Sequence, residues 1–254
     1  MSTMTPVMAP EAPEPNGPSG SINHLGRLIG VFFSPKETLQ SIAARPSWLV
    51  PVVLMVVLGT ATAFVMNQKV DWRDVASKRL EESPRAANMS AEQKEQQLAM
   101  SAKVSPYFVY VFGTLIPILA VVITAAVLLL AYNLVGGANA NFAQAMGIVS
   151  HAMIVGLIGT VFLILVLYLK PPGTIDLDNP VATNVGAFLP ESTPKALMSL
   201  AKSIDVLSIW TILLISVGFV AVNPKKLKGK SLSIVIAVWA IYVAIKMGGA
   251  WIFS

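Results

Sequence analysis

The chain has 254 residues, of which 55% are hydrophobic and 12% charged, with a formal net charge of +5. Soluble domains carry roughly a quarter charged residues, so this composition and a mean hydropathy of +0.69 exclude an ordinary soluble domain and predict an all-α, polytopic membrane protein. The sequence has no cysteine, which excludes disulfides, thiolate metal sites and cysteine catalysis. Basic residues beside membrane spans account for the net charge, so no nucleic-acid partner is expected.

The amino-terminal part divides into a tail and an amphipathic segment. Residues 1–21 are rich in proline and lack a large apolar cluster, which predicts a disordered tail. Because this tail lacks the basic start and apolar core of a signal peptide, the first membrane span is expected to direct insertion. Residues 22–47 form the amphipathic segment, and in its first part, residues 22–33, the apolar side chains follow one helical face that is too short to cross a membrane. This segment is predicted to lie at the membrane interface, and the alternative is a soluble helix packed on a neighbour.

A capping pattern lies within the amphipathic segment. Ser34 is followed by Pro35 and, three residues after the cap, by Glu37. The pattern predicts a capping box and a second short helix that ends before Pro46.

Five apolar segments make up the predicted membrane domain, residues 48–253. Between Lys103 and Lys170, 66 consecutive residues lack Asp, Glu, Lys and Arg. This run accommodates two helices that each cross an apolar layer of about 30 Å, joined by a glycine-rich turn. The predicted spans are residues 48–66, 107–134, 145–169, 206–222 and 231–253.

Three further features concern the helices of this domain. Pro117, which we take as the one interruption in the middle of a span, is expected to kink the second span. A capping box at Ser90 predicts a separate polar helix that ends near Lys103. Small residues at four-residue spacing predict two packing faces. They are Gly59 with Ala63 in the first span, and Ala152, Gly156 and Thr160 in the third.

Ionisable residues in or beside the spans are candidates for function. His151 lies in the third span with no acid near it in sequence, so we interpret it as a polar packing residue. Asp205 begins the fourth span and Lys246 lies in the fifth, roughly 26 and 23 Å from the connection between them at 1.5 Å per residue. A charge pair at matched depth is one hypothesis. The other is that Lys246 snorkels outward alone and Asp205 caps the fourth helix.

The connection between the fourth and fifth spans carries the densest positive charge. Its lysines are Lys225, Lys226, Lys228 and Lys230, within eight residues that contain no acid. A raw count of basic residues favours the opposite orientation, but a dense cluster is the better positive-inside signal. It predicts a cytoplasmic amino terminus, an external carboxy terminus and contact of these lysines with anionic lipid.

Residues at both ends of the chain resemble a known family pattern. They are Ser34, Pro35, Glu37 and Pro46 before the first span, and Asp205, Trp210 and Gly218 in the fourth. The pattern is similar to the Yip-one domain family, five-span membrane proteins named for interaction with Ypt/Rab GTPases, and most of all to its bacterial branch. The resemblance covers residues 25–253 and implies five helices, a cytoplasmic amino terminus and a non-enzymatic role. The tail lacks the aromatic pattern of eukaryotic members, which argues against GTPase binding, and the composition suits a bacterial inner membrane.

Two functions remain open. The leading hypothesis is a membrane-organising or partner-binding protein whose partners are the bilayer, anionic lipid, and another protein or a second copy of the chain. The alternative is a small-solute transporter or channel, or an accessory subunit of a transport complex, in which His151, Asp205 and Lys246 line a path. No enzyme and no cofactor are expected, because two histidines without intramembrane carboxylates form neither a metal site nor an acid–base pair.

Overall fold

A computed structural model describes residues 23–81, 83–171, 174–177, 179–190 and 192–252, and the predicted disordered tail lies outside these residues. Within them the chain is helical and forms no strand beyond an isolated bridge between Asn184 and Asp205, which confirms the all-α class. The helices are α1 (His24–Phe33), α2 (Pro35–Ala44), α3 (Leu49–Lys69), α4 (Trp72–Glu81), α5 (Ala91–Leu134), α6 (Phe142–Met153), α7 (Gly156–Leu169), α8 (Lys195–Ser203), α9 (Val206–Val222), α10 (Pro224–Leu227) and α11 (Ser231–Ile252), with 3₁₀ turns at Pro84–Asn88 and Val185–Phe188.

Four stretches of helix in the described part of the chain are long and apolar enough to cross a membrane. They are α3, α5, α6 with α7, and α11. The predicted fourth span corresponds to α9, which has 17 residues and is therefore about 26 Å long. This length is a little less than the hydrocarbon layer of about 30 Å. The chain is a multi-pass membrane protein.

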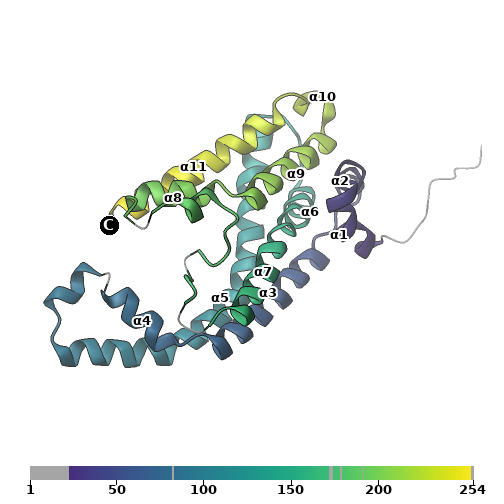
Figure 1. Ribbon diagram of the computed structural model, residues 1–254. Helices are drawn as coiled ribbons and strands as arrows, with labels where there is room; N and C mark the ends of the chain where they lie inside the picture. The colour runs from purple at the N-terminus through teal and green to yellow at the C-terminus, as the bar shows by residue number, and fades with distance from the viewer. Residues whose placement is uncertain (1–22, 82, 172–173, 178, 191, 253–254) are drawn as a thin grey trace, which may run out of the picture.

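The polar segment before the second span does not form a separate helix. A capping box between Ser90 and Gln93 starts α5 as predicted, but α5 then continues for 44 residues through Pro106 and Pro117. Figure 1 shows α4 and the first part of α5 projecting away from the other helices as an arm, and α5 changes direction where it joins them. The amide of Asn67 in α3 donates to the carbonyl oxygen of Pro106 (3.1 Å). This bond ties the base of the arm to the first span.

Helices α3 and α5 approach closely at a pair of glycines. A Cβ added at Gly113 would lie 2.7 Å from the carbonyl oxygen of Gly59 and 3.3 Å from Cβ of Ala63. The hydroxyl oxygens of Thr60 and Thr114 are 3.1 Å apart beside this crossing. Backbone-to-backbone contact of this kind needs small residues on both helices, so Gly59 and Ala63 form the packing face that their spacing predicted.

Helix α6 is enclosed by its neighbours. Its residues Ala145–Ala152 are all buried, because α2, α5 and α9 pack around it (Figure 1). Gly218 of α9 admits the side chain of Ile148, and a Cβ added there would overlap it. The next helix, α7, instead exposes apolar side chains such as Phe162 and Leu165. The predicted third span therefore consists of a buried helix, α6, and a helix with an exposed apolar surface, α7.

The third span is interrupted at Ile154 and Val155, an interruption that the sequence analysis did not predict. The amides of Ile154 and Val155 donate to residues three positions earlier, His151 and Ala152 (both 3.3 Å). Such a 3₁₀ stretch turns the helix, and short stretches of this kind often mark hinges. As a result Gly156 faces outward, with no atom within 4 Å of an added Cβ. The predicted packing stripe through Ala152, Gly156 and Thr160 is therefore wrong beyond Ala152.

Candidate functional site

One buried arginine holds the two amino-terminal helices, α1 and α2, together. Arg27 of α1 is only 7% exposed. Its guanidinium donates to the carbonyl oxygens of Ser41 (3.0 Å) and Arg45 (2.9 Å) and to the hydroxyls of Ser41 (2.8 Å) and Ser47 (2.7 Å). Bonds from a charged donor are stronger than those between neutral groups. The planar fork of arginine thus fixes α1 to the end of α2 and to the start of the first span, which a lysine ammonium could not do.

This arginine holds a positive charge next to α6. Burial, and next the neighbouring Arg45, lower the pKa of Arg27, yet arginine stays protonated in proteins. Among the described residues no carboxylate lies within ion-pair distance of Arg27. Arg27 and His24 both act electrostatically on His151. The sequence analysis did not single out Arg27.

The predicted capping box at Ser34 does not form. Ser34 does precede α2, with Pro35 as the first helical residue, but its side chain makes no capping hydrogen bond. The reason is the sharp connection to α1: the Ser34 amide donates to the carbonyl of Gly30 (2.8 Å), so this residue ends α1 as well as beginning α2. Glu37 is exposed in the first turn of α2. A capping box that the sequence analysis missed begins α6, where Asn141 and Gln144 exchange hydrogen bonds (2.9 and 3.0 Å).

Helix α1 carries apolar side chains on two faces. On the inner face Val31 is fully buried and the ring of Phe32 meets that of Trp210 edge to face, with centroids 5.6 Å apart. On the outer face, three exposed apolar residues follow each other at four-residue spacing. This α1 stripe consists of Leu25, Ile29 and Phe33, which are 70%, 61% and 84% exposed. The outer side of α2 is polar by contrast, with Lys36, Glu37 and Gln40 exposed.

The lysine-rich connection lies against the glycine-rich turn. We call residues 136–141 and 223–230 together the basic face. The amide of Asn223 donates to the carbonyl oxygen of Ala138 (3.2 Å), and Leu227 is fully buried beside Gly136. All four lysines, Lys225, Lys226, Lys228 and Lys230, are exposed. Figure 1 shows α10 at the same end of the molecule as α1 and α2.

Beneath the basic face, α5, α9 and α11 are joined by buried polar contacts. Tyr132 stacks on Phe219 with ring centroids 3.8 Å apart, and its hydroxyl donates to the carbonyl oxygen of Ser231 (2.8 Å). The Ser231 hydroxyl donates in turn to the carbonyl oxygen of Ser216 (2.8 Å). These contacts satisfy buried polar groups that would otherwise be costly in an apolar medium.

His151 lies in the buried part of α6. Its Nδ1 is 2.8 Å from the carbonyl oxygen of Gly147, one turn earlier, and this contact requires a proton on Nδ1. The hydroxyl of Ser150 donates to the same carbonyl (3.2 Å). Both side chains are buried. They form hydrogen bonds to a backbone carbonyl of their own helix just before the interruption at Ile154. This environment suits a polar packing residue, and it does not join His151 to Asp205 or Lys246.

Asp205 and Lys246 have separate partners. The Asp205 carboxylate accepts from the amide of Ser208 (3.0 Å) and caps α9, while the Lys246 ammonium donates to the hydroxyl of Ser203 (3.1 Å). Among the described residues no ion pair joins Asp205 and Lys246. The helical rise therefore predicted correctly that Lys246 lies at the depth of the segment before α9. Its partner there is the hydroxyl of Ser203, two residues before Asp205.

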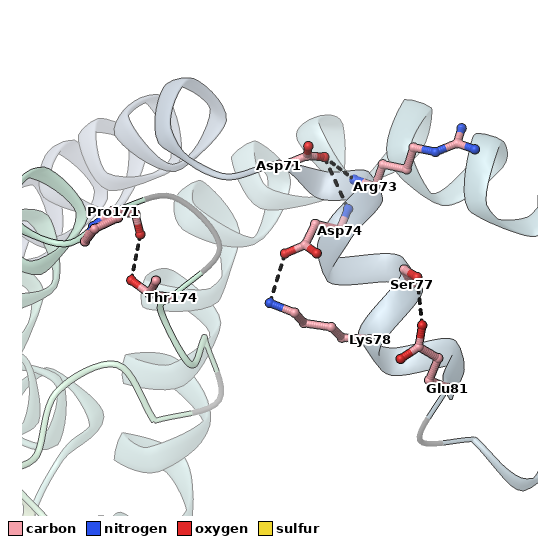
Figure 2. Close-up of polar contacts among 8 residues, drawn as sticks. All are labelled: Asp71, Arg73, Asp74, Ser77, Lys78, Glu81, Pro171 and Thr174. Atoms are coloured by element: carbon pink, nitrogen blue, oxygen red, sulfur yellow. Dashed lines mark hydrogen bonds and ion pairs between the residues drawn. The ribbon is translucent and has the colours of Figure 1, made fainter.

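The arm carries the charged contacts of the opposite end. Figure 2 shows Asp71 capping α4 through the amides of Arg73 (2.9 Å) and Asp74 (3.2 Å), and Asp74 pairing with Lys78 (3.0 Å). The guanidinium of Arg73 also meets both carboxylate oxygens of Glu95 in α5 (2.6 and 2.7 Å), a contact that raises the pKa of Arg73. A cavity of about 120 Å³ separates the start of α4 from the loop at Ile175–Leu177. Its lining mixes acidic and basic side chains, so it has no single charge preference.

The described residues bring no three His, Asp or Glu side chains together in a way that could hold a metal ion. What the geometry offers instead is an exposed apolar stripe, a basic face, and a polar arm at the other end of a membrane bundle.

The match to a family model agrees with this architecture. The model for the Yip1 domain matches residues 29–247, so the chain belongs to the Yip1 domain family, which confirms the resemblance seen in the sequence. No curated protein and no solved structure gives a significant match. Of the family-pattern residues, Trp210 contacts Phe32 and Gly218 admits Ile148. Pro46 lies in the connection between α2 and α3. The pattern thus marks where the helix pair and α9 pack.

Proposed function

We propose that this protein organises the bacterial inner membrane as a non-enzymatic, five-span protein, with its amino terminus and basic face cytoplasmic and its carboxy terminus outside. The α1 stripe supports this proposal most directly. Its three large side chains point away from the core, while the adjoining α2 exposes polar groups. A helix of this kind lies in the plane of the interface with its apolar face among the acyl chains.

The energies are sufficient for stable contact with one leaflet. Full burial of a large apolar side chain contributes roughly 1.5–3 kcal/mol, and each lysine near an anionic surface adds about 1 kcal/mol. Because Arg27 fixes α1 to the first span, the stripe cannot leave the membrane independently. A helix inserted into the cytoplasmic leaflet alone expands that leaflet, which favours curvature of the bilayer. The same apolar stripe could instead bind a partner protein that carries a complementary apolar surface.

The test uses the full chain in vesicles that contain phosphatidylglycerol. Since the chain has no cysteine, Ile29→Cys carries a single environment-sensitive fluorophore, and Gln40→Cys on the polar side of α2 is its control. We expect brominated lipid to quench the label at position 29 and not at position 40. Vesicle shape is then compared by electron cryo-microscopy with the variant that replaces all three stripe residues by Gln. If position 29 is not quenched, or both proteins leave vesicles equally round, membrane organisation through α1 is refuted.

One observation favours the alternative, a transporter or an accessory subunit of a transport complex. The third span is interrupted at Ile154 and Val155 beside the buried His151, and broken helices are common where transporters bind solute. His151→Gln in proteoliposomes tests this reading. Solute flux that depends on His151 would support transport, and its absence from both wild type and variant would exclude this path.

A further inference from the structure

Lys246 is a charge with few partners in an apolar helix. It lies in α11, whose neighbouring residues Ile241, Tyr242 and Ile245 expose apolar surface. Of the three donors on an ammonium, one meets the hydroxyl of Ser203 (3.1 Å). The Ser203 hydroxyl gives its own proton to the carbonyl oxygen of Ser199 (2.7 Å), so it acts toward Lys246 as a neutral acceptor.

The charges around Lys246 do not neutralise it. Among the described residues no carboxylate lies within ion-pair distance of Lys246, and the group that acts on it electrostatically is another cation, Lys202 of α8. Asp205, two residues after Ser203 in the sequence, is engaged in capping α9. A charge in a span costs several kcal/mol unless it finds a partner, and the partner shown for the Lys246 ammonium among the described residues is the neutral hydroxyl of Ser203.

The position of Lys246 along α11 places it near a headgroup layer. Six residues separate it from the end of α11 at Ile252, which is about 9 Å at 1.5 Å per residue. A lysine side chain bridges most of this distance by snorkelling. Tyr242 and Trp251, exposed on the same helix, are residues typical of the interfacial belt.

Helix α8 forms the other wall. Figure 1 shows α8 lying alongside the carboxy-terminal half of α11, and the two helices are in contact. Ser199 and Ser203, one turn apart, are buried against this contact, and the Ser199 hydroxyl has no hydrogen-bond partner within the described part of the chain. Leu197 on the same helix exposes apolar surface. Cations, an unused hydroxyl and apolar side chains thus meet at one edge of the bundle.

We propose that Lys246, with Lys202 and the Ser199 hydroxyl beside it, binds the phosphate of an anionic phospholipid, at the end of the bundle opposite the basic face. Phosphate oxygens accept from the two unused donors of the Lys246 ammonium, and the acyl chains lie along Ile245 and Leu197. A lipid supplies both the anion and the apolar contact, whereas free phosphate supplies only the first. The site is independent of the α1 stripe and of the function proposed for it.

Native mass spectrometry of the purified full chain tests the proposal. Phosphatidylglycerol is titrated into delipidated protein, with phosphatidylcholine as the zwitterionic comparison. Lys246→Met keeps the apolar stem and is expected to weaken the tightest phosphatidylglycerol binding about tenfold or more, since bonds from charged donors are the strong ones. Lys246→Arg should retain binding. Lys94→Met, on the arm, removes a charge elsewhere and should change nothing.

Three results would overturn the proposal. They are equal affinity of wild type and Lys246→Met, equal affinity of the wild type for both lipids, and displacement of the lipid by inorganic phosphate alone. Thermal unfolding without lipid checks the fold: Lys246→Met should be at least as stable as wild type, because it removes a charge from an apolar helix. If Lys246→Arg also loses binding while remaining folded, the phosphate does not recognise the charge and the proposal fails.

Discussion

Replacing Arg27 by Ala should release the amino-terminal helix pair from the bundle. The guanidinium makes four hydrogen bonds, two of them to carbonyl oxygens of Ser41 and Arg45. The serine hydroxyls can turn toward water, but each carbonyl loses a bond to a charged donor that contributes about 1.5–3 kcal/mol. The local opening free energy should therefore fall by about 3–6 kcal/mol.

A cysteine at a buried position measures this opening. Val31 is fully buried in α1, so Val31→Cys reacts with a maleimide only when the helix pair opens. A loss of about 3 kcal/mol raises the labelling rate by about a hundredfold, because each 1.4 kcal/mol is a factor of ten. Arg45→Ala is the matched control, since it removes an exposed arginine whose carbonyl oxygen stays in place. If the Arg27→Ala and Arg45→Ala proteins label at the same rate, the four bonds do not hold the pair.

Four further substitutions test other contacts of the structure. Gly113→Val should lower the free energy of unfolding, measured by thermal unfolding in detergent, by a few kcal/mol, because its Cβ lies 2.7 Å from the carbonyl oxygen of Gly59. Gly156→Ala has open space around its Cβ and should raise the same free energy by about 0.5–1 kcal/mol. A destabilised Gly156→Ala would contradict the outward position of that residue. Tyr132→Phe removes one buried hydrogen bond and should cost about 0.5–1.5 kcal/mol in the same assay; no change would mean that water replaces it. Glu95→Gln breaks an exposed ion pair that solvent and salt screen, so it should leave the unfolding temperature nearly unchanged at high salt. A clear loss of stability at high salt would show that the arm depends on this pair.

Much of the architecture follows from local patterns. Apolar length gave the long helices, the small pair Gly59 and Ala63 gave the α3–α5 crossing, and the capping box at Ser90 gave the start of α5. These features depend on neighbours within one or two turns, which the sequence shows directly. The cap at Asn141 follows the same rule and was available in the sequence.

The remaining features depend on contacts between distant segments. Arg27 acts through acceptors 14 to 20 positions away, and no spacing rule connects an arginine to carbonyl groups. Lys246 meets Ser203 across 43 positions, so its depth was predictable and its partner was not. The interruption at Ile154 lies among apolar residues without proline, and side-chain bonds to the Gly147 carbonyl precede it. Such choices are made by packing and not by local propensity.

The enclosure of α6 also constrains how the chain assembles during synthesis. Helices α2 and α5 are made before α6, but α9, which covers another side of it, is made only after α7, α8 and the intervening loop. Until α9 is inserted, Ile148 and the other residues that face it remain open to lipid. Completion of the core therefore waits for the fourth predicted span, and a ribosome that stalls before α9 leaves a bundle with one wall missing.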